Sequence, residues 1–225
     1  MRSDLDWPLW KHNRRIDAVT PMDEAVRRVL AEYEGRIAAE RRLTQAVDLK
    51  QFIARRDEFL LPIGPDTAQV LNILIKSAMA RSILEVGTSY GYSTLWLADA
   101  ARHTDGRVVS LELADYKARY AREALARAGL ADRVTIHVGS ALATLPELQG
   151  PFDFVLIDLW KDLYVDCLDL IYPKLAPGAF VVADNMILPE EVRADAENYR
   201  RRIRQLEFDS VLLPIGSGIE LSRRR

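Results

Sequence analysis

The sequence is poor in cysteine and histidine, with one cysteine and three histidines among 225 residues. A single cysteine excludes an intrachain disulfide framework. Cys167 shares a helical spacing with Tyr164, Leu168 and Ile171, which predicts a small core residue on a buried helix face. The three histidines are expected to be structural or exposed. His12 lies in an unassigned segment, His103 in a polar turn and His137 in a predicted strand.

The chain also lacks a long apolar run and a strong excess of either charge. No stretch approaches the ~20 apolar residues of a membrane span, and the N-terminus carries charges throughout. The net charge of −2 and the pI near 6.0 give no global attraction to nucleic acid or anionic membranes. We therefore expect a cytoplasmic protein with neither as a partner. The basic residues 223–225 are expected to form a solvated end.

Apolar residues make up 49% of the chain, which is enough for one core of ordinary size. We expect a single domain over residues 1–225, divided into an N-terminal helical extension (1–58) and an α/β core (60–222). Helical spacing predicts helices over 20–43, 45–58 and 66–79. Thr20 is the expected cap of the first helix, with Pro21 at its first position and Asp23 at a capping-box spacing.

From residue 82 onward, short apolar runs alternate with amphipathic stretches. Strands separated by helices predict a mostly parallel sheet with helices on both faces. The expected strands are 83–86, 108–113, 134–138, 152–157 and 179–183. One helix is expected to start at residue 93, and four others are expected over 115–128, 142–148, 162–175 and 190–206. Residues 210–222 predict two strands joined by a tight turn at 216–218, so the last strand should be antiparallel to its neighbour.

Polar residues follow two of the predicted strands at the point where each ends. Asp158 comes after the strand 152–157, and Asp184 and Asn185 come after 179–183. Ligands of parallel sheets bind outside the carboxyl ends of the strands, and carboxylate and amide oxygens suit Mg²⁺. The pattern predicts a metal site with Lys161 as a base beside it. The alternative is that these residues cap helices and turns, with Lys161 exposed to solvent.

A glycine-containing turn follows the first predicted strand, in the segment from Glu85 to Ser93. Gly87 and Gly91 permit close approach of a ligand to the backbone. Glu112 ends the next strand at the spacing of an acid that binds ribose hydroxyls. Ser89 replaces the second glycine of a dinucleotide-binding loop, which favours a ribose-containing ligand without pyrophosphate over NAD. The alternative is an ordinary glycine-rich turn with an exposed Glu112.

Taken in order, these segments resemble the S-adenosylmethionine-dependent, cation-dependent O-methyltransferases, the group that contains catechol and caffeoyl-CoA O-methyltransferases. The resemblance covers about residues 60–222 and rests on LEVGTSYGYSTL, SLEL, HVGSALATLPEL, VLIDLWKDLY, LAPGAFVVADN and the terminal hairpin. It implies a Rossmann-like class I methyltransferase fold with a seven-stranded sheet. It also implies methyl transfer from S-adenosylmethionine to a small phenolic acceptor, with Mg²⁺ or another divalent cation.

The resemblance further implies roles for individual residues. The cation would be held by Asp158, Asp184 and Asn185, with Lys161 as general base and Asp158 beside it in catalysis. Residues expected at the cofactor are Ile63, Glu85, Gly87, Ser93, Glu112, Ser140, Ala141, Asp158 and Trp160. Within this set, Glu112 is matched to the ribose, Gly87, Ser93 and Ile63 to the methionine end, and Ser140, Ala141 and Trp160 to the adenine. A homodimer is expected because relatives often form one.

Two departures from the family pattern concern the adenine and the acceptor. Leu159 stands where the mammalian catechol enzyme has a histidine, so one adenine contact is expected to be lost, and Glu220 is offset from the family's substrate-orienting acid. Trp7 and Trp10 are candidates for packing on the same chain, on a partner subunit or over the substrate. Two other functions stay open: a metal-independent methyltransferase for an amine or a nucleic-acid base, and a non-catalytic cofactor-binding protein of the same fold.

Overall fold

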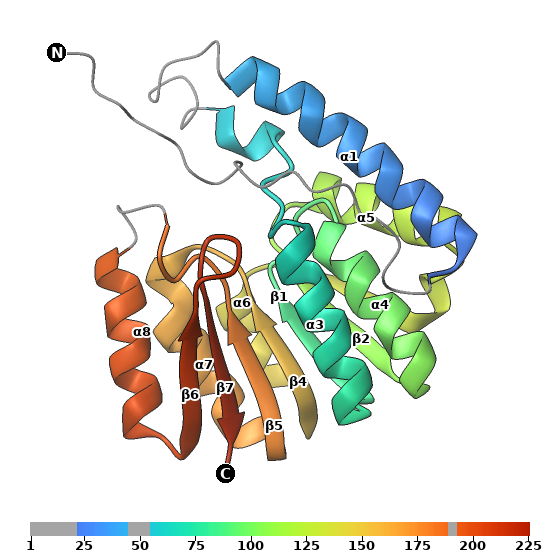
Figure 1. Cartoon of the computed structure of the whole chain (residues 1–225). Helices are drawn as coiled ribbons and strands as arrows, with labels where there is room; N and C mark the ends of the chain where they lie inside the picture. The colour runs from blue at the N-terminus through green and yellow to red at the C-terminus, as the bar shows by residue number, and fades with distance from the viewer. Residues whose placement is uncertain (1–21, 45–54, 189–192) are drawn as a thin grey trace, which may run out of the picture.

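The computed structural model describes residues 22–44, 55–188 and 193–225. Within them the chain forms a seven-stranded sheet in the order β3-β2-β1-β4-β5-β7-β6 (Figure 1). All neighbours from β3 to β5 are parallel, whereas β7 is antiparallel to both β5 and β6. The expected α/β fold with a C-terminal antiparallel hairpin is therefore confirmed.

The strands follow the apolar runs closely. They are β1 (Ser82–Val86), β2 (Arg107–Glu112), β3 (Val134–Val138), β4 (Phe152–Ile157), β5 (Leu175–Ala183), β6 (Phe208–Leu213) and β7 (Ile219–Arg224). The central strands β1 and β4 are almost wholly buried because helices cover both of their faces. Strand β5 starts four residues earlier than expected, at Leu175.

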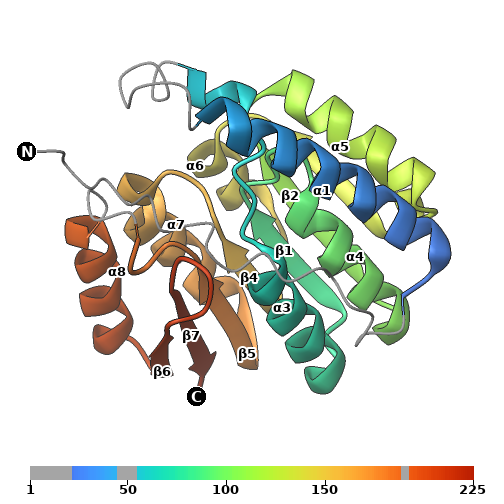
Figure 2. The same cartoon turned by 45° about the horizontal axis from the view of Figure 1, so that its top comes forward.

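Helices lie on both faces of the sheet (Figures 1 and 2). One layer contains α3 (Pro65–Ala78), α4 (Tyr92–Thr104) and α5 (Asp115–Arg127), with α1 (Glu24–Thr44) packed over α4 and α5. The other contains α6 (Ala141–Thr144), α7 (Tyr164–Ile171) and α8 (Arg193–Gln205). In the described residues, no helix is long and apolar enough to span a bilayer.

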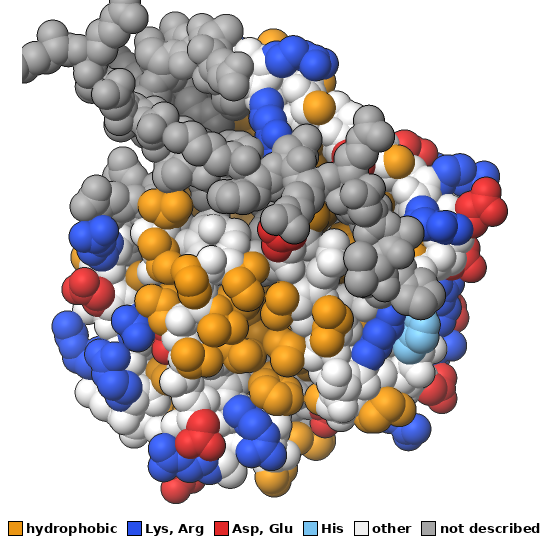
Figure 3. Space-filling view, in the orientation of Figure 1, with side chains coloured by type: hydrophobic (Ala, Val, Ile, Leu, Met, Phe, Trp, Pro, Cys, Tyr) orange, Lys and Arg blue, Asp and Glu red, His pale blue; other side chains and the backbone are white. Residues whose placement is uncertain are grey.

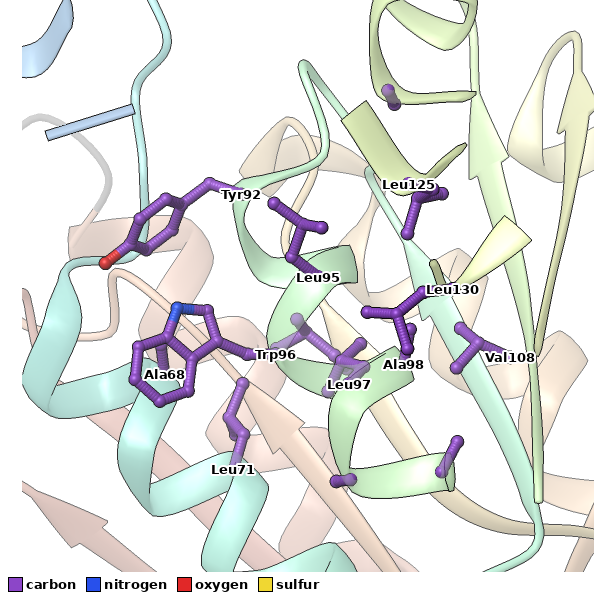
Figure 4. Packing of buried hydrophobic residues seen from close by; sticks show 14 of the residues in the cluster. Ala68, Leu71, Tyr92, Leu95, Trp96, Leu97, Ala98, Val108, Leu125 and Leu130 are labelled. Atoms are coloured by element: carbon purple, nitrogen blue, oxygen red, sulfur yellow. The ribbon is translucent and has the colours of Figure 1, made fainter. Parts of the chain in front are cut away.

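Each helical layer encloses its own apolar cluster against the sheet. In the first, the fully buried Trp96 extends from α4 toward Ala68 and Leu71 of α3, below Tyr92 (Figure 4). In the second, Cys167 is buried together with Leu168 of the same helix, which confirms its assignment as a core residue. Close packing of this kind fixes the sheet edge on which the functional loops stand.

Some predicted boundaries were wrong. Helix α1 starts at Glu24, and the Asp23 carboxylate accepts a hydrogen bond from the Ala25 amide at 2.8 Å, so Asp23 is the cap and not a residue of the first turn. Several residues named above lie outside the described residues: Trp7, Trp10, His12, Thr20, Pro21 and the segment 45–54. Within the second helix expected there, residues 56–58 form a 3-10 turn, η2 (Arg56–Glu58).

The helix expected over 162–175 is shorter than predicted. The 3-10 turn η5 (Lys161–Leu163) precedes α7, and a second one, η6 (Tyr172–Lys174), follows it around Pro173. Similarly, the segment expected as a helix over 142–148 divides into α6 and the 3-10 turn η4 (Leu145–Glu147). His103 lies in the last turn of α4 and not in a loop, whereas His137 lies in β3 as expected.

Candidate functional site

The parallel strands all end at one edge of the sheet, and this edge carries most of the predicted site residues. Ile157 at the end of β4 is paired in register with Ala183 at the end of β5. The next residues, Asp158 and Asp184, therefore leave neighbouring strands at the same level. The sequence-based expectation that the two acids lie close together agrees with this register.

Asp184 has an unusual environment for a carboxylate. It is 1% exposed, and its Oδ1 atom has no hydrogen-bond partner in the described part of the chain. Burial, and next the charge of Asp158, raise the pKa of Asp184 to about 8. A buried acid facing a second acid is costly unless a positive charge compensates it, so the chemistry of the site fits a bound cation.

The backbone after Asp184 is shaped by the C-terminal hairpin. Asn185 has a positive φ of 55°, which turns the chain sharply out of β5. The amide of Met186 donates to the Gly218 carbonyl at 2.9 Å, and the amides of the two following residues both donate to the Ser217 carbonyl. A Cβ on Gly218 would lie 2.4 Å from Cγ1 of Ile187. The hairpin turn therefore fixes the direction in which Asn185 leaves the sheet.

Lys161 is held inside the site and is not a solvent-exposed lysine. Its side chain is 11% exposed, and Nζ donates to Asp158 Oδ1 at 3.3 Å and to the Leu159 carbonyl at 3.0 Å. A third hydrogen bond, of 2.5 Å, goes to the hydroxyl of Tyr164, which donates in turn to the Asp184 carbonyl at 3.1 Å. Sequence reasoning missed this role of Tyr164, although its spacing of three residues from Lys161 was available as a signal.

Tyr164 is a fixed, neutral link between the lysine and the end of β5. Burial, followed by the charges of Asp158 and Asp184, raises the pKa of Tyr164 well above the ordinary tyrosine value. Its ring also packs edge-on against Tyr199 of α8, with ring centroids 5.6 Å apart. The position of Lys161 thus depends on the packing between α7 and α8.

The glycine turn after β1 touches the acidic loop directly. Gly87 has a φ of 109°, and a Cβ there would come within 2.0 Å of the Asp158 carbonyl oxygen. No residue other than glycine can occupy this position without moving one of the two loops. The structure therefore brings the predicted cofactor turn and the predicted metal loop into contact.

Glu112, at the end of β2, holds the same turn from the other side. It is 8% exposed; one carboxylate oxygen accepts the Ser89 amide at 2.7 Å and the other accepts the Ala114 amide at 2.9 Å. The alternative of an exposed Glu112 is therefore wrong. The carboxylate is fixed at the strand end, with lone pairs left over for further donors.

Glu85 lies below the turn, fully buried within the sheet. Its carboxylate accepts hydrogen bonds from Ser93 (2.6 Å), Thr94 (2.6 Å) and Ser110 (2.5 Å). Burial, the largest effect, raises the pKa of Glu85 to about 7. In this structure it anchors the start of α4, which places Ser93 beneath the glycine turn. A direct contact of Glu85 with a cofactor stays a prediction.

The remaining predicted cofactor residues lie around this edge. Ile63 is buried, and its carbonyl oxygen would be 3.3 Å from a Cβ on Gly216, so the segment before α3 lies against the hairpin turn. Ser140 is exposed and Ala141 half-buried just beyond β3, and Trp160, 44% exposed, follows the β4 end. Glu220 is buried in an ion pair of 2.8 Å with Arg200.

Comparison with known proteins shows which family the chain belongs to. A model of the O-methyltransferase family matches residues 37–225. The chain belongs to the O-methyltransferase family. It is 40% identical over 163 residues to a catechol O-methyltransferase of Mycobacterium tuberculosis, covering 68% of this chain and 74% of that protein. It is 27% identical over 198 residues to caffeoyl-CoA O-methyltransferase 1 of Eucalyptus globulus, covering 79% and 80%.

Solved structures give the same assignment. The O-methyltransferase TomG of Streptomyces achromogenes, determined in complex with S-adenosylmethionine, superposes with a TM-score of 0.72 at 26% identity. The match covers 92% of each chain. The protein is thus an S-adenosylmethionine-dependent O-methyltransferase of the catechol and caffeoyl-CoA type with a Rossmann-like methyltransferase fold.

Proposed function

We propose that this O-methyltransferase methylates one hydroxyl of a small phenolic acceptor with adjacent oxygens, using a divalent cation such as Mg²⁺ held by Asp158, Asp184 and Asn185. The observation that carries the proposal is the buried Oδ1 of Asp184, which has no hydrogen-bond partner among the described residues and stands beside Asp158 at neighbouring strand ends. Two carboxylates and an amide oxygen form a hard, partial ligand set that leaves positions for two acceptor oxygens. When bound, the cation would supply the positive charge that stabilises an ionised hydroxyl.

The protein's own contribution to the proton transfer is Lys161. A phenol has a pKa near ~10 in water, so its proton must be removed before it attacks at neutral pH. In the proposed reaction Lys161 acts as the neutral amine and the phenolic proton passes to the lone pair of Nζ. A bond forms between the phenolic oxygen and the methyl carbon, and the C–S bond breaks with its electron pair going to sulfur. Tyr164 and the Leu159 carbonyl keep Nζ at the strand end during this step.

The methyl donor is proposed to lie across the glycine turn. Glu112 would accept the ribose hydroxyls, and Gly87, Ser93 and Ile63 would border the methionine end, with Glu85 beneath them. Ser140, Ala141 and Trp160 would border the adenine, and Asp158 would lie between donor and acceptor. The contact between Gly87 and Asp158 supports this arrangement because it leaves a short path from the donor turn to the acceptor oxygen.

A screen of acceptors with and without metal tests the proposal. Catechols, hydroxycinnamoyl thioesters and flavonoids are incubated with S-adenosylmethionine, and methylated products are measured by mass spectrometry. We expect turnover of a vicinal diol in Mg²⁺ and its loss in EDTA, with recovery after Mg²⁺ is added back. Full turnover in EDTA would show a metal-independent enzyme, and cofactor binding without any product would favour a non-catalytic protein.

We also propose that two copies associate through a face of the sheet that no helix of the described residues covers, called here the uncovered face. On the side of β5, β7 and β6 that faces the viewer in Figure 1, apolar side chains gather at the surface (Figure 3). Phe180, Val211 and Leu221 line a groove there, edged by Asp209 and Arg223. Asp209 and Arg223 stand opposite each other in register within one copy, and Asp209 is ion-paired with Arg225 at 3.0 Å. A twofold axis through the groove would bring the Asp209 of each copy near the Arg223 of the other.

Nucleic acid and membranes are not proposed partners, and a cytoplasmic location stays a prediction.

A further inference from the structure

Helix α1 lies outside the alternating strand-helix core, yet it contacts the turn proposed to bind the methyl donor. We propose that Tyr33 and Arg36 of α1 are positioning residues for S-adenosylmethionine. They hold Tyr90 so that the preceding amide, that of Ser89, stays bonded to Glu112. This inference rests on the proposed donor site at Glu112, and it adds an element to that site that the sequence pattern does not indicate.

Tyr33 makes the most direct contact. Its side chain is 1% exposed, and its hydroxyl donates to the carbonyl oxygen of Tyr90 at 2.5 Å, across 57 positions of sequence. Burial raises the pKa of Tyr33 well above its usual value, so the hydroxyl remains a donor. The hydroxyl would also lie 3.6 Å from a Cβ on Gly91, so it reaches both residues after Ser89.

Arg36, one turn further along α1, clamps the Tyr90 side chain. Its guanidinium carbon lies 4.2 Å from the centre of the Tyr90 ring and 5.2 Å from that of Tyr120. The same side chain donates to Glu40 at 2.7 Å and to the Glu58 carbonyl at 3.0 Å. These contacts join α1 and α5 around the Tyr90 ring.

The segment before α3 completes the clamp. The Tyr90 hydroxyl donates to the Asp57 carbonyl at 3.0 Å, and Lys117 of α5 forms an ion pair with the Asp57 carboxylate at 3.1 Å. Ser89 Oγ makes a longer contact of 3.4 Å with the Leu60 carbonyl. The turn is therefore held through the backbone and side chain of Tyr90 and through Ser89 itself.

The clamp holds Ser89 in a backbone conformation that is costly for a residue with a Cβ. Ser89 adopts a φ of 48°, in the left-handed region that a residue with a Cβ occupies at a cost. Such a conformation persists only where the surroundings over-determine it, and here its amide points to Glu112 at 2.7 Å. If the Tyr33 hydrogen bond is removed, the turn gains freedom that donor binding must then restrict.

Binding of S-adenosylhomocysteine to the full chain, measured by calorimetry, tests the inference. For Tyr33→Phe we expect a roughly tenfold weaker affinity, the loss that one buried hydrogen bond supports. The KM for S-adenosylmethionine should rise in parallel, while kcat at saturating donor and the KM for the acceptor stay unchanged. Arg36→Lys, a partly exposed position, should shift the same two values by less and provides a variant that keeps the fold.

Tyr172→Phe is the matched control. The Tyr172 hydroxyl accepts a hydrogen bond of 3.4 Å from the Glu207 amide, whereas the Tyr33 hydroxyl donates one of 2.5 Å. The Tyr172 ring packs on Phe208, far along the sheet from the glycine turn. An equal loss of affinity in this variant would mean that general destabilisation, and not the clamp, weakens binding. Unchanged affinity in both Tyr33→Phe and Arg36→Lys would overturn the inference.

Two further measurements separate a failed clamp from a failed donor site. Glu112→Gln should weaken S-adenosylhomocysteine binding; an unchanged affinity would refute the proposed donor site itself. Amide hydrogen exchange of residues 87–95 in the cofactor-free protein depends only on the clamp and should be faster in Tyr33→Phe than in wild type and Tyr172→Phe. Equal exchange rates in all three proteins would refute the clamp whatever the role of Glu112.

Discussion

At the scale of single residues, Lys161 is a lysine whose three hydrogen-bond acceptors are all supplied by the site. As the proposed base it should contribute to kcat and little to donor binding. We expect Lys161→Met to lower kcat by about 10²–10⁴-fold, the range for a positioned general base, with S-adenosylhomocysteine affinity kept. Steady-state kinetics with the acceptor found in the screen, together with calorimetry, measures both values.

Lys174 offers a control for this substitution. Its Nζ donates to the carbonyls of Leu145, Pro146 and Leu148, so it has the same number of acceptors, none of them at the strand edge. Lys174→Met should reduce thermal stability and leave kcat near the wild-type value. A Lys161→Met protein as active as Lys174→Met would exclude Lys161 as the base.

At this scale the shared position of the candidate metal residues could be predicted, because the information is local in the sequence. Asp158, Lys161, Asp184 and Asn185 follow two strands whose apolar runs are plain, so their shared edge could be inferred. The contact of Tyr33 with Tyr90 could not be inferred, because it joins residues far apart in sequence through the packing of α1, and neither tyrosine stands out from its neighbours.

At the scale of elements, the hairpin between β6 and β7 shapes the proposed metal loop. In Gly218→Ala the new methyl group would meet Ile187 and displace the loop that follows Asn185. We expect the apparent affinity for Mg²⁺ in the activity assay to fall about 10–100-fold, as for outer-shell changes at other metal sites. Activity against Mg²⁺ concentration measures this.

A second glycine, Gly129, separates the clash with Ile187 from the cost of placing alanine at a positive φ. Gly129 also has a positive φ, of 67°, but no atom of the described residues lies within 4 Å of a Cβ placed there. Gly129→Ala should therefore lose about 1–2 kcal/mol of folding free energy from left-handed strain, with unchanged Mg²⁺ dependence. If both alanine variants responded to Mg²⁺ alike, the hairpin would not position the metal loop.

Glu85 connects β1, β2 and α4, and its ionisation should affect the stability of that unit. The pKa of Glu85 is raised by burial from 4.5 to about 7, so its contribution to stability is fully present below about pH 4.5 and is lost as pH rises through 7. The shift corresponds to about 3 kcal/mol. Urea unfolding of the cofactor-free protein between pH 5 and 8 should show this decline in wild type.

The Glu85→Gln variant lacks the titrating group and supplies the reference. Its absolute stability should be lower because one acceptor oxygen for Ser93, Thr94 and Ser110 is lost, so the comparison concerns slopes against pH. We expect a flatter profile in the variant. Parallel profiles would mean that Glu85 titrates elsewhere than near pH 7.

Element boundaries show where sequence patterns lose information. The parallel strands were predicted well because each contains a short run rich in apolar residues, although β5 starts four residues earlier than its run. The expected helix over 162–175 was wrong at both ends, since 3-10 turns at Lys161–Leu163 and Tyr172–Lys174 share the amphipathic spacing of α7. Pro173 was a visible signal for the second boundary.

At the scale of the whole molecule, the proposed association of two copies gives a direct prediction. Val211 is 49% exposed on the uncovered face, so Val211→Asp should fold normally. Burying its charge between two copies would be costly, and we expect a dimer for wild type and a monomer for the variant by light scattering. Val138, 42% exposed, lies on β3 at the opposite end of the strand order from β6, so Val138→Asp should remain dimeric. A monomeric wild type, or a dimeric Val211→Asp, would contradict the prediction.

The contact of Gly87 with the Asp158 carbonyl has a consequence for how such an enzyme can diverge. In the proposed arrangement the donor turn and the loop at the acceptor would touch through backbone atoms, so lengthening either loop alone would change the distance between the methyl group and the acceptor oxygen. Variation in acceptor preference must therefore arise in segments that border the outer side of the acceptor, while the lengths of these two loops stay fixed together.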